Sequence, residues 1–132
     1  MSLLSTVSPN AVQSIRAFRS LDLQNEAVAT GQHFLYADCT PAQDKLEVLT
    51  IIANAFGFPD HFGQNFDALY DCLTDMVFKS GQQTGFVVVI EHLPNTEHFD
   101  RDMRETLLDV FRDAADFWAK KKVPCRVFYS SE

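Results

Sequence analysis

The stretch FPDHFGQNFDALYDCLTDMVF, residues 58–78, carries the clearest pattern in this chain of 132 residues. Asn65 is a good N-cap residue, and Gly63 before it predicts a tight loop in a backbone conformation closed to other residues. Wound at about 3.6 residues per turn, the residues that follow separate into two sides. The apolar side holds Phe66, Leu69, Leu73, Met76 and Val77, and the polar side holds Asp67, Asp71, Thr74 and Asp75, with Tyr70 on the border. We therefore expect an amphipathic helix with an exposed acidic side.

Helix stability explains this acidic side only in part. Asp67 lies in the first turn, where the positive end of the helix dipole favours a carboxylate. Asp71 and Asp75 follow towards the negative end, where each like-charged pair costs roughly 0.2–0.5 kcal/mol. Penalties this small are common on solvated surfaces. Two interpretations therefore stand: an ordinary solvated face, or a docking surface for a cationic partner.

Composition favours a basic partner over an anionic one. Eighteen acidic residues against eleven basic ones give a formal charge of −7, which repels nucleic-acid phosphates and anionic lipid. No apolar run approaches the ~20 residues of a membrane-spanning helix, and the first residues lack the pattern of a secretory leader. We expect a soluble, cytoplasmic protein of one domain that binds neither nucleic acid nor membrane directly. Its cysteines, Cys39, Cys72 and Cys125, are expected to be reduced.

The order of apolar patterns along the chain predicts a fold of alternating strands and helices. Residues 1–32 are expected to form an N-terminal extension packed on or beside the core, with an edge strand over Ser14–Leu21 and a short helix over Leu23–Thr30 that Asp22 caps and Gly31 closes. In residues 33–132, strands are expected at His33–Cys39, Phe86–Ile90 and Arg126–Ser130, and further helices from Pro41 to Phe56, ended by Gly57, and from about 101 to 121. This order favours an α/β fold with a parallel sheet.

The run around the acidic helix resembles the signature of the barstar family, intracellular inhibitors of ribonuclease. The shared pattern is an aromatic residue, Gly63, Asn65 and then Asp67-Ala-Leu-aromatic-Asp71-Cys-Leu-Thr. The likeness continues in the same order through GFVVVIE (85–91), DVFRDAADF (109–117) and PCRVFYSS (124–131), and covers about residues 36–131. It implies a two-layer domain over residues 33–132, with a three-stranded parallel sheet packed with helices.

The resemblance also implies a function and a site. A ribonuclease grips phosphates with cationic side chains, so a rigid row of carboxylates can block its cleft as a phosphate mimic. We expect an antitoxin or immunity role against a basic ribonuclease or nuclease toxin, without catalysis and without a cofactor. The expected partner-binding residues are Asp71 at the centre, Asp67, Tyr70, Thr74 and Asp113 around it, and His61 and Phe62 on the rim.

Four of these positions depart from the barstar pattern. His61 and Phe62 stand where barstar has two tyrosines, and Tyr70 stands where it has tryptophan. Asp113, which belongs to an acidic row on the long helix, replaces a glutamate and is one methylene shorter. Interfaces concentrate their energy in a few aromatic and charged anchors, so such changes alter which partner is bound. Barnase itself is therefore not assumed to be the target.

Two other classes of function stay open. An enzyme would need a motif such as a nucleophile elbow, a phosphate-binding glycine loop or an HExxH helix, and no such motif occurs. His92 and His98, beside Glu91 and Glu97, lack the usual spacing of zinc ligands. The second class is an acidic protein-binding module that regulates a partner, or associates with itself, without inhibiting a nuclease. A basic nuclease quenched in stoichiometric amounts would separate this class from an inhibitor.

Overall fold

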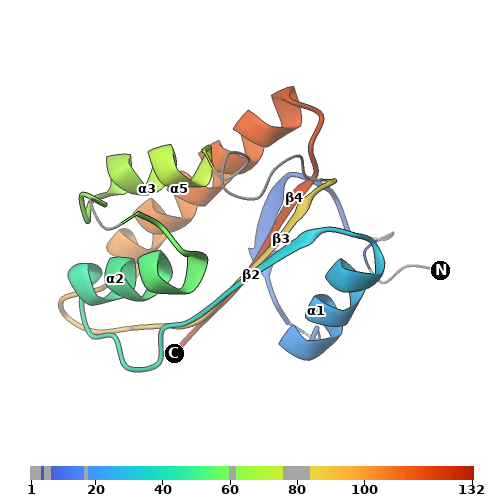
Figure 1. Ribbon diagram of the computed structural model, residues 1–132. Coiled ribbons are helices and arrows are strands. Elements are labelled where there is room, and N and C mark those ends of the chain that lie inside the picture. Colours follow the sequence, from blue (N-terminus) through green and yellow to red (C-terminus); the bar gives the residue numbers. More distant parts are fainter. Residues whose placement is uncertain (1–3, 5–6, 17, 60–61, 76–83) are drawn as a thin grey trace.

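The computed structural model describes residues 4, 7–16, 18–59, 62–75 and 84–132. In this part of the chain four strands form one parallel sheet in the order β1-β4-β3-β2 (Figure 1). The elements are β1 (Ala11–Ser14), α1 (Ser20–Ala29), β2 (His33–Asp38), α2 (Lys45–Phe56), α3 (Phe66–Leu73), β3 (Phe86–Leu93), α5 (Arg101–Lys120) and β4 (Cys125–Ser131). The expected α/β class and parallel sheet are confirmed, but the expected count of three strands is wrong.

The additional strand is β1, which pairs with β4 at one edge of the sheet, Ala11 opposite Arg126 and Ser14 opposite Tyr129. The expected strand over Ser14–Leu21 is therefore misplaced. Arg16 adopts a left-handed conformation, with φ of 46°. This conformation ends the extended segment, although the sequence pattern predicted that the strand continues to Leu21. Of the apolar residues after Ser14 that the structure describes, Ile15 precedes the turn at Arg16 and Leu21 lies in the first turn of α1.

The N-terminal helix also begins earlier than expected. Its first residue is Ser20 and its N-cap is Arg19 rather than Asp22. Asp22 lies in the first turn, where its carboxylate accepts a hydrogen bond from Arg19 Nε at 3.3 Å. Gly31 has φ of 71° just after the helix, so its expected left-handed role is confirmed.

The helices lie on both faces of the sheet: α2, α3 and α5 cover one face, in line with the two layers implied for residues 33–132, and α1 of the N-terminal extension covers the other. Successive residues of a strand point to opposite faces. On β3, Val87 and Val89 pack with Leu23 and Ala27 of α1, while alternate residues such as Val88 pack into the larger core with α2, α3 and α5. Figure 1 shows α1 on one side of the sheet and the other three helices across from it.

Local capping sets the helices that carry the larger core. Asp44 is the N-cap of α2, and its carboxylate accepts from the Glu47 N–H at 2.9 Å, so this helix starts four residues later than the expected Pro41. Gly57 ends α2 in a left-handed conformation, as expected. On α5, Asp100 accepts from the Met103 N–H at 2.9 Å. These caps satisfy backbone donors that have no partner within the helix.

Candidate partner-binding groove

The α3 helix is oriented by its cap and by two buried leucines. The Asn65 side chain accepts from the Ala68 N–H at 2.7 Å, which confirms Asn65 as the N-cap, and Leu69 and Leu73 are fully or almost fully buried. The helix ends at Leu73. Two residues of the expected apolar side, Met76 and Val77, lie outside the described residues.

The loop before α3 differs from the expectation in one detail. The left-handed residue there is Gln64, with φ of 53°, and not Gly63. Gly63 fits for another reason: a Cβ at this position would lie 3.3 Å from Asn65 Nδ2 and 3.4 Å from Ala68 Cβ. The glycine therefore permits a close approach between the loop and the first turn of α3.

The α3 helix packs beside α5, and one hydrogen bond joins their ends. The indole Nε1–H of Trp118, on α5, donates to the Leu73 carbonyl at the end of α3 over 3.1 Å, and the bond is buried. Trp118 itself packs against Phe86 of the sheet, with ring centroids 5.0 Å apart. Because the same indole contacts the sheet and α3, it helps to fix the spacing of the two helices.

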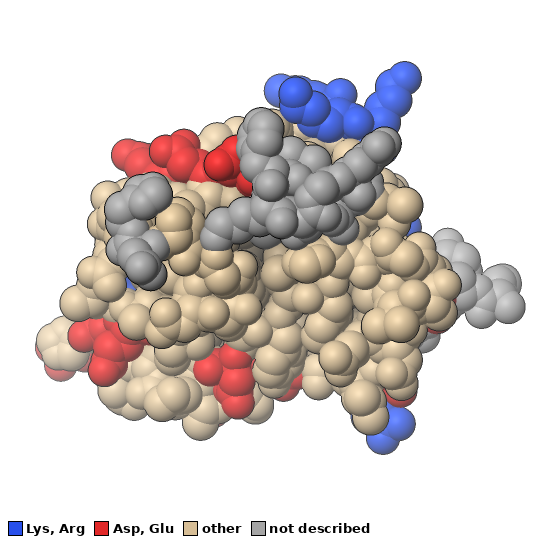
Figure 2. All heavy atoms as spheres, viewed as in Figure 1, with Lys and Arg blue, Asp and Glu red and all other residues tan. Residues whose placement is uncertain are grey.

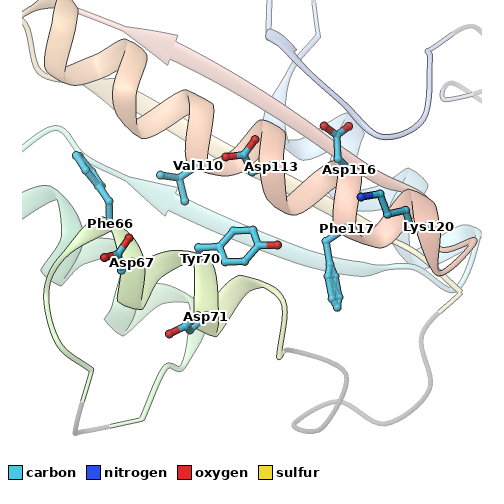
Figure 3. A pocket seen from close by; sticks show the side chains of 9 residues that line it. All are labelled: Phe66, Asp67, Tyr70, Asp71, Val110, Asp113, Asp116, Phe117 and Lys120. Carbon is cyan, nitrogen blue, oxygen red and sulfur yellow. The ribbon is translucent and has the colours of Figure 1, made fainter.

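Between the two helices lies a groove of about 560 Å³, which we call the acidic groove (Figure 3). The α3 side consists of Phe66, Asp67, Tyr70 and Asp71, and the α5 side consists of Val110, Asp113, Asp116, Phe117 and Lys120. The structure therefore brings Asp113 of the long helix together with the α3 carboxylates, although 42 residues separate it from Asp71 along the chain.

The four aspartates of this groove are exposed. Within the described residues none of them belongs to an ion pair. The neighbouring Asp109, by contrast, lies 2.6 Å from Arg112, which also pairs with Glu105 at 3.7 Å. Unneutralised carboxylates gathered in one concave site create a strong local negative potential. The acidic groove thus suits a cationic partner.

A comparison with protein families bears on this geometry. The family model described as Barstar (barnase inhibitor) matches residues 32–130. The chain belongs to the barstar family. Members of this family are inhibitors of barnase-type ribonucleases rather than enzymes. No curated protein matches the sequence. The family match includes both walls of the acidic groove and leaves β1 and α1 outside.

Asp71 has a special place in this barstar-family chain, because it also borders a second hollow. That hollow, of about 340 Å³, is lined by Phe58, Pro59, Phe62, Gly63, Ala68, Asp71, Cys72 and Asp75. The half-buried Phe62 packs against Phe58, with ring centroids 5.4 Å apart. Of the expected rim pair, Phe62 is therefore next to Asp71, and His61 lies outside the described residues.

Thr74 does not line the acidic groove. It is the C-cap residue of α3, and its hydroxyl donates to the carbonyls of Tyr70 and Asp71 at 2.9 and 3.2 Å. Sequence reasoning did not place Asp116, Phe117 or Lys120 in the site, although they line it. They lie three, four and seven residues after Asp113, which puts them on one helix face, and that spacing is the signal that identifies them.

The described residues give no sign of a metal site or of a membrane span. No group of three or more His, Cys, Asp and Glu side chains in that part of the chain is arranged to hold a metal ion. His92 instead lies between two carboxylates, 3.4 Å from Glu91 and 3.6 Å from Glu132. None of the described helices has both the length and the apolar character needed to cross a bilayer.

Proposed function

We propose that this chain inhibits a basic ribonuclease by placing its acidic groove over the cationic cleft in which the enzyme binds RNA. The observation that carries the proposal is the gathering of Asp67, Asp71, Asp113 and Asp116 in one groove without an ion pair among the described residues. A ribonuclease cleft must attract phosphates. Carboxylates held where the phosphates would bind therefore compete with RNA, and their charge accelerates association of the inhibitor with the enzyme.

The side chains have separate roles in this proposal. Asp71 is the central anion, because it borders both hollows. Tyr70, 37% exposed, and Phe117 offer aromatic area beside the carboxylates. Phe62 packs at the rim, and we retain His61 there on the family pattern. Thr74 supports the helix end that carries Asp71. All but the loop residues lie on or at the end of a helix, so little conformational entropy is lost on binding.

The biological role we propose is that of an antitoxin. A cell that makes a ribonuclease needs a tight, stoichiometric inhibitor to protect its own RNA. The departures at His61, Phe62 and Tyr70 indicate a nuclease whose surface differs from barnase around the cleft. A basic nuclease toxin is therefore the expected partner.

Titration of ribonuclease activity tests this proposal. Barnase, and basic ribonucleases fractionated from the source cells, are titrated with the purified chain. We expect one of these activities to fall linearly to zero at a one-to-one ratio. Asp71→Ala is expected to slow association and to speed dissociation, whereas Asp22→Ala, on α1 across the sheet, behaves like the unaltered chain. If no ribonuclease is inhibited, or if Asp71→Ala inhibits as well as the unaltered chain, the proposal is wrong.

A further inference from the structure

Three consecutive lysines lie where the acidic groove ends. Lys120 is the last residue of α5, and Lys121 and Lys122 follow it. Lys120 lines the acidic groove. Together with Tyr70, Phe117 and Lys121 it also lines a third hollow, which shares three of its four lining residues with the groove. Figure 2 shows Lys and Arg side chains gathered above the end of α5, apart from the acidic side chains over α3. The groove thus has an acidic part and a basic end, with two aromatic residues shared between them.

Helix termination does not account for three lysines. The helix dipole favours cations in the last turn by roughly 0.3–1 kcal/mol each. Lys122, however, adopts a left-handed conformation with φ of 61°. A residue with a Cβ pays roughly 1–2 kcal/mol in that conformation, and glycine is the usual occupant after a helix. Local stability alone would therefore favour glycine at position 122.

The lysines are also available to a partner. Asp116 lies one turn before Lys120 on the same helix, yet in the described chain Lys120, Lys121 and Lys122 form no ion pair. Lys121 Nζ lies 5.3 Å from the centre of the Phe117 ring. The ammonium group is thus held beside the groove, in contact with an aromatic face that the groove shares.

We infer that the lysine end of the groove binds a carboxylate-bearing surface on the same ribonuclease, next to its cationic cleft. This inference rests on the proposed function. Phosphate of RNA is the less favourable occupant, because the neighbouring aspartates and a formal charge of −7 repel it. A groove with charges of both signs fixes the direction in which the enzyme sits, and it selects against ribonucleases whose cleft has a uniformly basic surround.

Charge reversal tests the inference through the sign of its effect. Lys120→Glu, Lys121→Glu and the control Arg101→Glu, at the other end of α5, each make the chain more negative by the same amount. Against a uniformly cationic surface, all three would speed association. Against carboxylates facing the lysines, Lys120→Glu and Lys121→Glu should raise the dissociation constant roughly tenfold or more, and Arg101→Glu should not. The measurement is stopped-flow association and dissociation, without RNA, with the ribonuclease identified by the titration above.

Two controls keep this test decisive. Glutamate is disfavoured at a helix C-terminus, so Lys121→Gln is measured as well, and thermal unfolding confirms that each variant folds. Unchanged or tighter binding by both lysine variants would overturn the inference. So would a dimer of the unaltered chain that Lys121→Glu dissociates, because the lysines would then face the aspartates of a second copy. Failure of the proposed function is separate: the unaltered chain then inhibits no ribonuclease, and the inference falls with it.

Discussion

Individual carboxylates in this chain differ in what they contact. Asp44 and Asp100 accept hydrogen bonds from helix N-termini, and Asp109 pairs with Arg112. Asp71 does neither within the described residues, and it is exposed between two hollows. An aspartate that stabilises nothing visible in its own fold is the one most suited to a partner. Asp67, Asp113 and Asp116 also form no ion pair in the described chain, and Asp71 is singled out among these four because it borders both hollows.

Burial gives the cysteines a testable property. Desolvation raises the pKa of Cys39 and Cys125 to about 12, from a usual value of 9.0. We therefore expect both thiols to resist Ellman's reagent at pH 8 in the folded protein and to react after unfolding in guanidinium. A Cys39→Ala/Cys125→Ala variant should show the same number of reactive thiols as the unaltered protein under native conditions. A lower number in that variant would contradict the prediction.

The same shift has a consequence for stability against pH. A thiol kept neutral in the folded state stabilises the fold fully below its usual pKa of 9.0. The unfolded chain ionises above that value and the folded chain does not, so this contribution falls as the pH rises from 9.0 towards about 12. The free energy of unfolding should accordingly decline over this range.

Residue-level chemistry was predictable from sequence where it is local. The cap at Asn65 and the left-handed glycines Gly31 and Gly57 depend on neighbouring residues alone, and they are confirmed. The loop at Gly63 was misjudged, because Gly63 permits a close approach to the first turn of α3 while the neighbouring Gln64 adopts the left-handed conformation. The helical spacing of Leu46, Leu49 and Ile52 predicts that all three face the core, but Leu46 is 53% exposed and Val48 is buried instead.

At the scale of elements, the acidic groove depends on how α3 and α5 are joined. The buried bond from Trp118 to the Leu73 carbonyl links the end of one wall to the other. Replacing Trp118 by phenylalanine keeps an aromatic ring but leaves that buried carbonyl without its donor. We expect Trp118→Phe to lower the free energy of unfolding by about 1–3 kcal/mol and to weaken binding of the ribonuclease.

The control for this change is Phe117→Leu, on the same helix but without a buried hydrogen bond. It should weaken binding through lost aromatic contact while changing stability less. Urea unfolding and the inhibition titration together separate the two effects. Equal stability of Trp118→Phe and the unaltered chain would show that the bond does not hold the walls in place.

The helices and strands were predicted better than which of them pack against one another. Hydrophobic periodicity identified β2, β3, β4 and the long helix with small errors at their ends. It could not pair α3 with α5, because each helix shows only which of its own sides is buried. Lys120 and Phe117 therefore stayed outside the expected site. The strand β1 was misplaced because its four residues carry too little pattern to outweigh the alternation that follows it.

At the scale of the whole molecule, the N-terminal segment belongs to the packing of the sheet. It lies outside the family match, which begins at residue 32. The Asn10 side chain nevertheless donates two hydrogen bonds to the far end of the chain. One goes to the carbonyl of Ala115, within α5, at 2.9 Å, and the other to the carbonyl of Val123, after α5, at 3.0 Å. We propose that residues 1–32 are an extension that completes the core instead of a separate unit.

Truncation tests that arrangement. A chain that starts at Gln32 loses α1 and β1, and so uncovers Val87, Val89 and Phe128, which are now fully buried. We expect lower stability, binding of the dye ANS and a tendency to aggregate, because the uncovered patch is continuous and apolar. A milder variant, Leu23→Ala, should cost about 2–5 kcal/mol by leaving a cavity on the same face. An unfolding midpoint unchanged by the truncation would show that the extension is dispensable.

Inhibition is expected to depend on where the carboxylates lie and not on how many there are. Two variants of equal net charge test this most directly. One variant neutralises Asp67, Asp71, Asp113 and Asp116 to asparagine, and the other neutralises Asp22, Glu97, Asp102 and Glu105 to their amides. The measurement is the inhibition constant of each for the same ribonuclease at fixed ionic strength. We predict that the groove variant loses inhibition while the other variant retains it. Equal inhibition constants for the two variants would contradict the account.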